Sequence, residues 1–149
     1  MTARKYRLGV TRKVANVVMK ALLERGIPVN GSTGFLLTTR GRKTGEDRTT
    51  PVNVLEVGGD RWLVSPYGRV GWVHNLRADA TARLRRGRRR ETWEVEEADA
   101  ATAGPVLRAY VRKIRVTAPF FDAKPSDPAE VFAAEADRHP VFRLARSRG

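Results

Sequence analysis

The strand-forming part of this chain opens with Gly34-Phe35-Leu36-Leu37-Thr38-Thr39-Arg40, a short run typical of a β-strand. A second run, Thr49 to Val57, alternates loosely between apolar and polar residues. Gly58-Gly59-Asp60 then predicts a hairpin turn, and Arg61-Trp62-Leu63-Val64-Ser65 predicts the returning strand. Pro66 ends that strand, because proline cannot donate a hydrogen bond to the ladder. The pattern favours an antiparallel sheet.

The residues that follow predict a short helix and a second hairpin. Trp72 to Ala78 is expected to form one or two helical turns. Thr81 to Arg86 and Glu91 to Glu96 flank Gly87 and predict two paired strands. Their inward-facing candidates are Leu84, Trp93 and Val95.

The last third of the chain is mainly helical by its periodicity. Ala100 to Val116 has an apolar face typical of an amphipathic helix. Thr117 to Asp127 contains two prolines and is expected to be a loop. Asp127 is the predicted N-cap of a short helix with Pro128 at its first position. Val141 to Leu144 is the candidate for a closing strand.

These elements predict one α+β domain over residues 1–149, with a mostly antiparallel sheet or barrel surrounded by helices. Residues 1–10 are expected to be flexible, 11–26 to form an amphipathic helix, 34–96 the barrel core, and 100–144 the helices and closing strand. The helix at 11–26 is basic on its polar face. It either docks on the core or lies on a membrane surface, so the predicted location is cytoplasmic with peripheral membrane contact as the alternative.

The composition favours an anionic partner. Lys and Arg number 29 against 16 Asp and Glu, which gives a net charge of +13. Such an excess suits nucleic acid, acidic lipid or a polyanionic small molecule. The chain has no cysteine, which excludes disulfides, thiolate metal sites and cysteine nucleophiles. Two histidines without thiols do not predict a metal site.

The strongest candidate for anion binding is the turn Gly41-Arg42-Lys43-Thr44-Gly45, followed by Arg48. Free backbone amides, two cations and a hydroxyl can hold several anionic oxygens at once. The spacing fits neither a Walker loop nor the dinucleotide fingerprint. A charged hairpin turn without a ligand is the alternative reading.

A second candidate begins where the third strand ends. Ser65 and Tyr67 flank the proline that ends it, and a hydroxyl there could face a cleft. Asn75 can donate to and accept from the carbonyl or imide of a ring system. Trp72 is either a core residue or a shelf for that ring.

Another basic segment is the run from Arg85 to Arg90. It is either a solvated hairpin tip or a contact to a nucleic-acid backbone or to the end of a polyanionic cofactor. No serine of the chain has the context of a nucleophile elbow, so a hydrolase triad is excluded.

Taken in order, these motifs resemble the deazaflavin-dependent nitroreductase family, whose members use reduced coenzyme F420. The resemblance runs from about Gly34 to Val95. It depends on Leu37 to Gly45 with Arg48, on Thr50-Pro51, on the Gly-Asp-Arg hairpin at 59–61, and on Trp72 to Ala78. The family fold is a split β-barrel similar to that of flavin-mononucleotide oxidases. The resemblance therefore implies that fold, with F420 as cofactor and FMN as the less favoured one.

The resemblance also implies roles for single residues. The phosphate and oligoglutamate portion of the cofactor would be held by Arg42, Lys43, Thr44, Gly45 and Arg48. The ring and its ribityl chain would be framed by Pro51, Val52, Val64, Ser65, Trp72, Val73, Asn75 and Leu76. Ser65 and Tyr67 are the candidates for contacts to the acceptor.

The implied activity is hydride transfer from reduced F420 to a quinone, a nitro compound or a conjugated enone. Some family members carry several C-terminal tyrosines over the substrate pocket. This chain has Tyr110 and the Phe120-Phe121 pair instead. The alternative function is a basic nucleic-acid-binding protein, or a cofactor- or lipid-binding protein without turnover.

Overall fold

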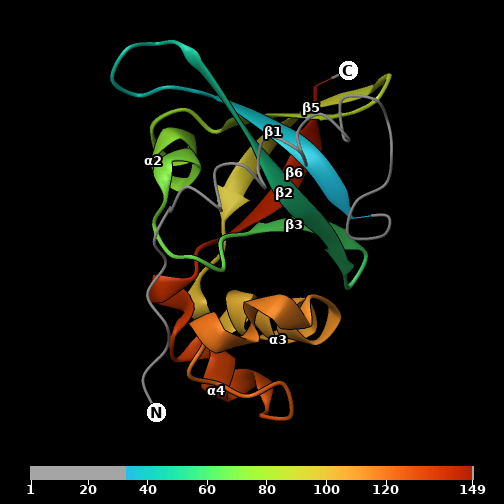
Figure 1. Cartoon of the computed structure of the whole chain (residues 1–149), viewed down its shortest axis with the longest axis vertical. Helices are drawn as coiled ribbons and strands as arrows, with labels where there is room; N and C mark the ends of the chain where they lie inside the picture. The colour runs from blue at the N-terminus through green and yellow to red at the C-terminus, as the bar shows by residue number, and fades with distance from the viewer. Residues whose placement is uncertain (1–32, 149) are drawn as a thin grey trace.

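The computed structural model describes residues 33–148, which form a closed antiparallel barrel with a layer of helices at one end (Figure 1). The strand order around the barrel is β1-β2-β3-β6-β5-β4. The strands are β1 (Gly34–Arg40), β2 (Asp47–Val57), β3 (Asp60–Val64), β4 (Thr81–Arg86), β5 (Arg89–Glu97) and β6 (Val141–Ser147). The helices are α2 (Gly71–Ala78), α3 (Ala100–Lys113), η1 (Arg115–Phe120), α4 (Ala129–Ala133) and η2 (Ala136–Arg138).

The hairpins that the sequence predicts set the barrel register. β1 pairs with β2 from Gly34 opposite Asn53 to Arg40 opposite Asp47, so their connecting turn lies at the end of both strands. β6 arrives last in the chain and closes the barrel by pairing with both β3 and β5. The closing strand is therefore longer than the four residues expected from its apolar run.

Two apolar clusters hold the fold together. One fills the barrel and includes Phe35, Leu37 and Leu63, with Val73 and Leu76 of α2 packed into it. The other joins the outer face of the barrel to α3, for example through Trp62, Leu107 and Val111. Burying these side chains is the main stabilising contribution, at about 25 cal/mol per Å² of apolar surface.

The contact between α3 and α4 depends on one glycine. A Cβ atom at Gly104 would lie 2.7 Å from the carbonyl oxygen of Ala129 and 3.0 Å from the Cβ of Ala133. Glycine therefore lets the two helices approach closely, although it is an unfavourable residue in a helix interior.

Three expectations for the last third are wrong in detail. α3 ends at Lys113, and the residues from Arg115 to Phe120 form a 3-10 helix rather than a plain loop. The N-cap of α4 is Pro128, not Asp127. The carboxylate of Asp127 instead accepts a hydrogen bond from the backbone of Lys124 at 2.7 Å, closing a separate turn.

The predicted N-terminal helix at 11–26 lies outside the described residues, and its proposed membrane contact stays a prediction. Within residues 33–148, no helix is long and apolar enough to cross a membrane.

Candidate active site

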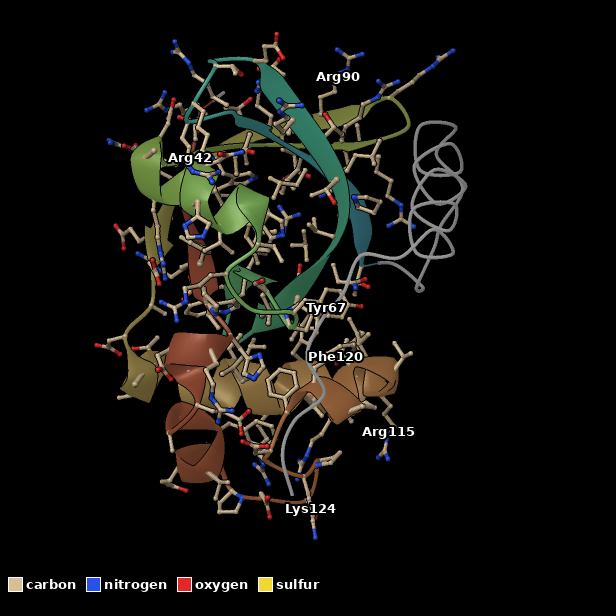
Figure 2. All side chains as sticks on the ribbon, turned by 60° about the vertical axis from the view of Figure 1, so that its left-hand side comes forward. Arg42, Tyr67, Arg90, Arg115, Phe120 and Lys124 are labelled. Carbon is tan, nitrogen blue, oxygen red and sulfur yellow. The ribbon has the colours of Figure 1, made fainter. Side chains whose placement is uncertain are left out.

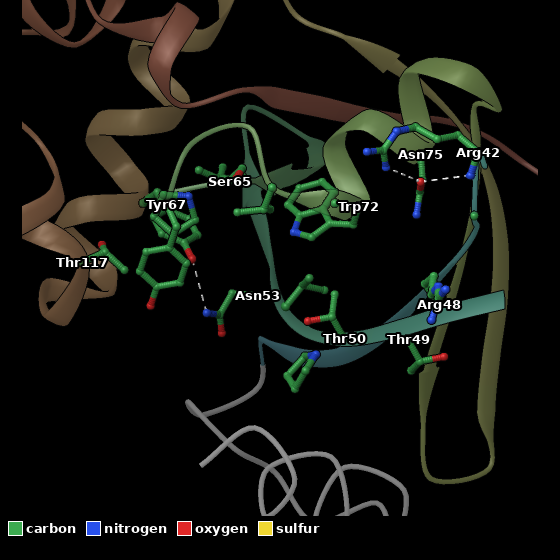
Figure 3. A pocket seen from close by; sticks show the side chains of 18 of the residues that line it. Arg42, Arg48, Thr49, Thr50, Asn53, Ser65, Tyr67, Trp72, Asn75 and Thr117 are labelled. Carbon is green, nitrogen blue, oxygen red and sulfur yellow. Dashed lines mark hydrogen bonds between the residues drawn. The ribbon is translucent and has the colours of Figure 1, made fainter. Parts of the chain in front are cut away.

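A cleft of about 880 Å³ runs from the turn between β1 and β2 to the last turn of α3 (Figure 3). One end is lined by the cations Arg42, Lys43 and Arg48. The other end, where the barrel meets the helical layer, is lined by side chains that carry no charge: Tyr67, Tyr110, Ile114, Val116 and Thr117. Figure 2 shows the same division, with Arg42 beside α2 and Tyr67 next to the helices. The cleft thus joins a cationic end to an apolar one.

Backbone hydrogen bonds shape the turn at the cationic end. The Gly41 amide donates to Glu46 at 2.7 Å, and the Gly45 amide donates to Gly41 at 2.8 Å. Gly45 has φ +77°, a conformation that residues with a side chain rarely adopt. This geometry exposes Arg42, Lys43 and Thr44 to solvent. Sequence reasoning placed these residues together correctly.

Within residues 33–148, Arg42 and Lys43 of this turn form no ion pair. Among the described residues, no carboxylate oxygen lies within 4 Å of the charged groups of Arg42 or Lys43. Arg48 lies 3.9 Å from Glu46, and both side chains are more than half exposed, so this pair is weak. The turn is therefore available to an anion.

Gly45 does not line this cleft. It lies on the other side of the turn, in a smaller cavity of about 380 Å³ together with Arg40, Arg42, Ala78 and Asp79. Its contribution to the main cleft is the backbone conformation that presents Arg42, Lys43 and Thr44.

Asn75 connects the turn to α2. It is 3% exposed and its Oδ1 accepts hydrogen bonds from the Arg42 backbone amide at 3.2 Å and from the Arg42 guanidinium at 3.0 Å. Its Nδ2 donates to the hydroxyl of Thr39 at 3.1 Å. Asn75 lines the cleft as predicted, but in this structure its amide orients the turn.

The middle of the cleft has apolar walls. Pro51 and Val52 on β2, Val64 at the end of β3, and Trp72 at the start of α2 line it. The Trp72 ring is partly exposed and packs on Phe142 of the barrel core with 5.9 Å between ring centroids. Trp72 therefore belongs partly to the core and partly to the cleft wall, and its role as a shelf for a ring stays a prediction.

Two predicted ring contacts lie elsewhere. Val73 is fully buried and Leu76 is 2% exposed, and both pack inside the barrel rather than along the cleft. Trp72 packs against the same barrel cluster, so Val73 and Leu76 support the cleft wall from behind.

The turn after β3 is held by several backbone contacts. The Ser65 hydroxyl donates to the carbonyl of Gly68, and the Ser65 amide donates to Pro140 at 2.9 Å. Ser65 lines the cleft, but its hydroxyl is occupied by the backbone. Tyr67 also lines the cleft, and its ring meets Phe120 edge to face at 4.8 Å.

A buried pair that sequence reasoning missed fixes this turn from the helical side. His139 lies with Nδ1 2.9 Å from the Pro66 carbonyl and Nε2 3.0 Å from Glu135. The Glu135 carboxylate also accepts the backbone amides of Asp122 and Ala123 at 3.1 and 2.8 Å. Burial lowers the pKa of His139 despite the neighbouring carboxylate. The i, i+4 spacing of Glu135 and His139 in the sequence is the pattern that could have predicted their contact.

Tyr110 reaches the cleft through a contact with β2 that the sequence did not predict. Its phenol lines the cleft, yet the residue is 2% exposed. Asn53 on β2 donates to the phenol oxygen at 3.3 Å, one of the dashed lines in Figure 3. Burial raises the pKa of Tyr110 well above its usual value. The phenol is therefore a neutral hydrogen-bonding group.

The basic run from Arg85 to Arg90 lies apart from the cleft. It forms the hairpin between β4 and β5, and no residue of that run lines the cleft. Figures 1 and 2 both place this hairpin away from the turn between β1 and β2. Arg88, Arg89 and Arg90 are exposed, as expected for a solvated hairpin tip.

A closed antiparallel barrel with flanking helices and a half-cationic cleft defines a split β-barrel protein that binds an anionic cofactor. A model of the F420H(2)-dependent quinone reductase family matches residues 10–126. The chain belongs to this family. It is an oxidoreductase that uses coenzyme F420, which confirms the resemblance noted in the sequence.

Solved structures share the fold at low sequence identity. A NimC/NimA family protein from Clostridium acetobutylicum is 16% identical with a TM-score of 0.54, covering 87% of this chain and 84% of that one. A protein of unknown function from Agrobacterium tumefaciens is 13% identical with a TM-score of 0.57, covering 100% and 60%. An F420 reductase is 14% identical with a TM-score of 0.50, covering 87% and 93%. A search among curated proteins finds no match.

Proposed function

We propose that the chain reduces uncharged conjugated carbonyl compounds, with quinones as the preferred acceptors, and that the acceptor binds at the Tyr67 and Tyr110 end of the cleft. The observation that carries this proposal is the division of the cleft into a cationic end and an uncharged end. An uncharged, flat acceptor loses little hydration when it enters an apolar site, whereas an anion would lose much more.

The residues of the cleft fit coenzyme F420 by their chemistry. Arg42, Lys43 and Arg48 can donate to the phosphate and to the oligoglutamate carboxylates, because guanidinium and ammonium groups make strong hydrogen bonds to such oxygens. The ring pocket would be formed by Pro51, Val52, Val64 and Trp72. Bound there, the reduced cofactor supplies a hydride.

The protein's part in the reaction is positional and electrostatic. The apolar walls would hold the acceptor against the cofactor ring and exclude water from between them. Of the two predicted acceptor contacts, the Ser65 hydroxyl donates to the Gly68 carbonyl. Tyr67 lines the cleft. We therefore retain Tyr67 as an acceptor contact and assign Ser65 to holding the turn.

Nitro compounds and enones are the second group of candidate acceptors. They too are conjugated and uncharged, and the apolar end would accept their ring or chain. Some family members carry several C-terminal tyrosines over the substrate pocket, whereas this chain has Tyr110 and the Phe120-Phe121 pair. Fewer hydroxyls lower the number of donors available to a nitro group, so we rank quinones first.

The test is a comparison of acceptors with one cofactor. Purified protein is titrated with F420 and, separately, with FMN, and binding is followed by cofactor fluorescence. Steady-state rates with F420H2 are then measured for a small naphthoquinone, a nitroimidazole and a cyclic enone. We expect tighter binding of F420 than of FMN and the highest kcat/KM with the quinone. A higher kcat/KM with the nitroimidazole would overturn the ranking.

A further inference from the structure

His139 is a buried side chain of the helical layer that contacts a residue of the cleft wall. Its Nδ1 lies 2.9 Å from the Pro66 carbonyl oxygen, and its Nε2 lies 3.0 Å from a carboxylate oxygen of Glu135. The ring of Phe121 stacks on the imidazole with 3.9 Å between ring centroids. Since His139 is 4% exposed, the imidazole has little room to turn. Both ring nitrogens are therefore held against their partners.

Both partners of the imidazole are hydrogen-bond acceptors. A carbonyl oxygen and an ionised carboxylate carry no proton, whereas a neutral imidazole has one N–H and one bare nitrogen. The pair of Glu135 and His139 therefore needs one additional proton to satisfy both contacts. An imidazolium facing a carboxylate meets this condition, and so does a neutral imidazole facing a carboxylic acid. In both arrangements Nδ1 is protonated and donates to the Pro66 carbonyl.

The groups around the pair favour the additional proton on the imidazole. Glu135 accepts the backbone amides of Asp122 and Ala123 at 3.1 and 2.8 Å, and the guanidinium of Arg138 lies 3.9 Å from it. These contacts stabilise the charged carboxylate. Arg138 also donates to the Asp122 carboxylate at 2.9 Å, and the turn after β3 contributes an uncharged carbonyl. Burial, with a smaller contribution from Arg138, lowers the pKa of His139 below its usual value of 6.5.

The contact to Pro66 changes when the additional proton leaves. The N–H that remains stays on Nε2, because a hydrogen bond to a carboxylate is stronger than one to a neutral carbonyl. Nδ1 then carries a lone pair that faces the lone pairs of the Pro66 oxygen. The contact to Glu135 is the same in both states. Loss of the proton therefore acts on the Pro66 carbonyl.

Pro66 belongs to the wall at the uncharged end of the cleft. Ser65, Pro66 and Tyr67 follow one another along the turn after β3, and all three line the cleft (Figure 3). The Ser65 amide donates to the carbonyl of Pro140, the residue that follows His139. One short segment thus holds the turn through two contacts, and of these two the contact made by His139 depends on a proton.

We propose that His139 is a positioning residue for the acceptor: a proton on Nδ1 holds Pro66 in place, and loss of that proton releases the cleft wall. This role rests on the proposed function, because the acceptor binds at the uncharged end of the cleft. A fixed wall keeps the shape into which a flat acceptor fits, whereas a released wall has to be ordered when the acceptor binds. Acceptor affinity should therefore fall as the pH rises.

Two variants and one control change the contacts separately. His139→Leu removes both N–H donors, so acceptor affinity should be low at every pH. Glu135→Gln provides an amide N–H for Nε2, so the neutral imidazole keeps its proton on Nδ1 and holds Pro66 at every pH. His74→Asn replaces the other histidine of the chain, on α2, and should keep the pH dependence of the unmodified protein. At one pH, all three should bind F420 within about twofold of the unmodified protein, because the cofactor tail lies at the other end of the cleft.

Acceptor affinity is measured without turnover. A small naphthoquinone is titrated into protein saturated with oxidised F420, from about pH 5 to about pH 8, and quenching of tryptophan fluorescence gives its dissociation constant. In the unmodified protein and in His74→Asn we expect this constant to rise by about 2- to 10-fold over the range, which corresponds to one hydrogen bond. In Glu135→Gln it should stay at the low value and in His139→Leu at the high value.

Nitrogen-15 NMR of the imidazoles shows which nitrogens carry protons. The chain has two histidines, so the spectrum of His74→Asn assigns His139. We expect Nδ1 of His139 to lose its proton with a midpoint below pH 6.5, and Nε2 to stay protonated. The midpoint for acceptor binding should be the same.

The outcomes are separable. A naphthoquinone dissociation constant that does not change with pH in the unmodified protein, or that changes equally in Glu135→Gln, would overturn the role of His139. If circular dichroism shows that a variant does not fold, different midpoints for acceptor binding and for the proton on Nδ1 overturn it in the unmodified protein. Absence of F420 binding to the unmodified protein would instead contradict the proposed function.

Discussion

Oδ1 of the buried Asn75 accepts two hydrogen bonds from one residue, Arg42, through its backbone amide at 3.2 Å and its guanidinium at 3.0 Å. Because α2 carries both Asn75 and Trp72, this contact fixes the distance between the cationic turn and the apolar middle of the cleft. A cofactor with an anionic tail and an aromatic ring needs that distance to be constant. Asn75 therefore links the two halves of the proposed cofactor site.

Replacing Asn75 should affect the cofactor tail before it affects the fold. Asn75→Ala removes the acceptor for Arg42, and hydrogen bonds to charged groups contribute about 1.5–3 kcal/mol each. We expect the F420 dissociation constant to rise by roughly tenfold or more, measured by fluorescence titration. Asn75→Asp should also weaken binding, because the new carboxylate would pair with Arg42. Tighter binding in Asn75→Asp would contradict this account.

The cations of the turn should contribute to affinity, because Arg42 and Lys43 have no carboxylate partner within residues 33–148. Arg42→Ala with Lys43→Ala is expected to weaken the binding free energy of F420 by about 1–3 kcal/mol per lost charged hydrogen bond. The matched control is Arg88→Ala with Arg90→Ala, which removes the same charge from the exposed hairpin. Equal losses in both double variants would mean that overall charge, and not the turn, attracts the cofactor. Titrations at several salt concentrations would show the same distinction.

Gly104 should be required for the packing of the helical layer. An added Cβ would lie 2.7 Å from the Ala129 carbonyl oxygen, closer than real Cβ atoms approach a backbone atom. Gly104→Ala would raise helix propensity but force α3 and α4 apart, and overpacking of this kind costs about 1–3 kcal/mol. We expect a lower midpoint of urea unfolding. The control is Ala101→Gly on the exposed side of α3, which should lower stability only by the propensity difference.

Much of the barrel could be predicted from local patterns, and the missing parts are those set by distant contacts. β1 and the hairpin turns follow from alternation and glycine signals, which depend on neighbouring residues only. β6 extends to Ser147 because it pairs with β3 and β5. The apolar pattern of its own residues does not predict this extension. The 3-10 helix after α3 likewise forms where two prolines suggested a loop.

The same limit applies to the candidate site. The cations between Gly41 and Gly45 are contiguous in sequence, so a turn with free amides could be foreseen. Asn53, Tyr110 and Thr33 come together across 57 and 20 positions of sequence separation, and nothing local marks them. The family resemblance assigned Val73 to the ring, but its side chain is buried in the barrel core, where its neighbours come from strands distant in sequence.

Glu135 should be one of the most sensitive buried positions. Its carboxylate accepts two backbone amides and contacts His139, and its side chain is 3% exposed. Glu135→Ala would leave these donors buried without an acceptor, at a cost of roughly 1–3 kcal/mol for each. We expect a large fall in the unfolding free energy and a loosened turn at Pro66. Glu135→Gln keeps one acceptor oxygen and should lose less, and equal losses in both variants would contradict the role given to the amide contacts.

The stability of α3 should depend on pH through its N-cap. Asp99 accepts the backbone amide of Thr102 at 2.8 Å, and this hydrogen bond holds the pKa of Asp99 below its usual value of 3.8. As the folded protein binds this proton less readily than the unfolded chain, the stabilisation is present above pH 3.8 and is lost as the pH falls through the lowered pKa. Asp99→Asn retains a capping oxygen that does not titrate. Urea unfolding between pH 2.5 and 5, at about half-unit steps, should therefore give a smaller decline in Asp99→Asn than in the unmodified protein. Since α3 carries Tyr110, the hydride rate of the unmodified protein should fall together with its stability over this range. Parallel stability curves for the unmodified protein and Asp99→Asn would show that Asp99 does not cause the pH dependence.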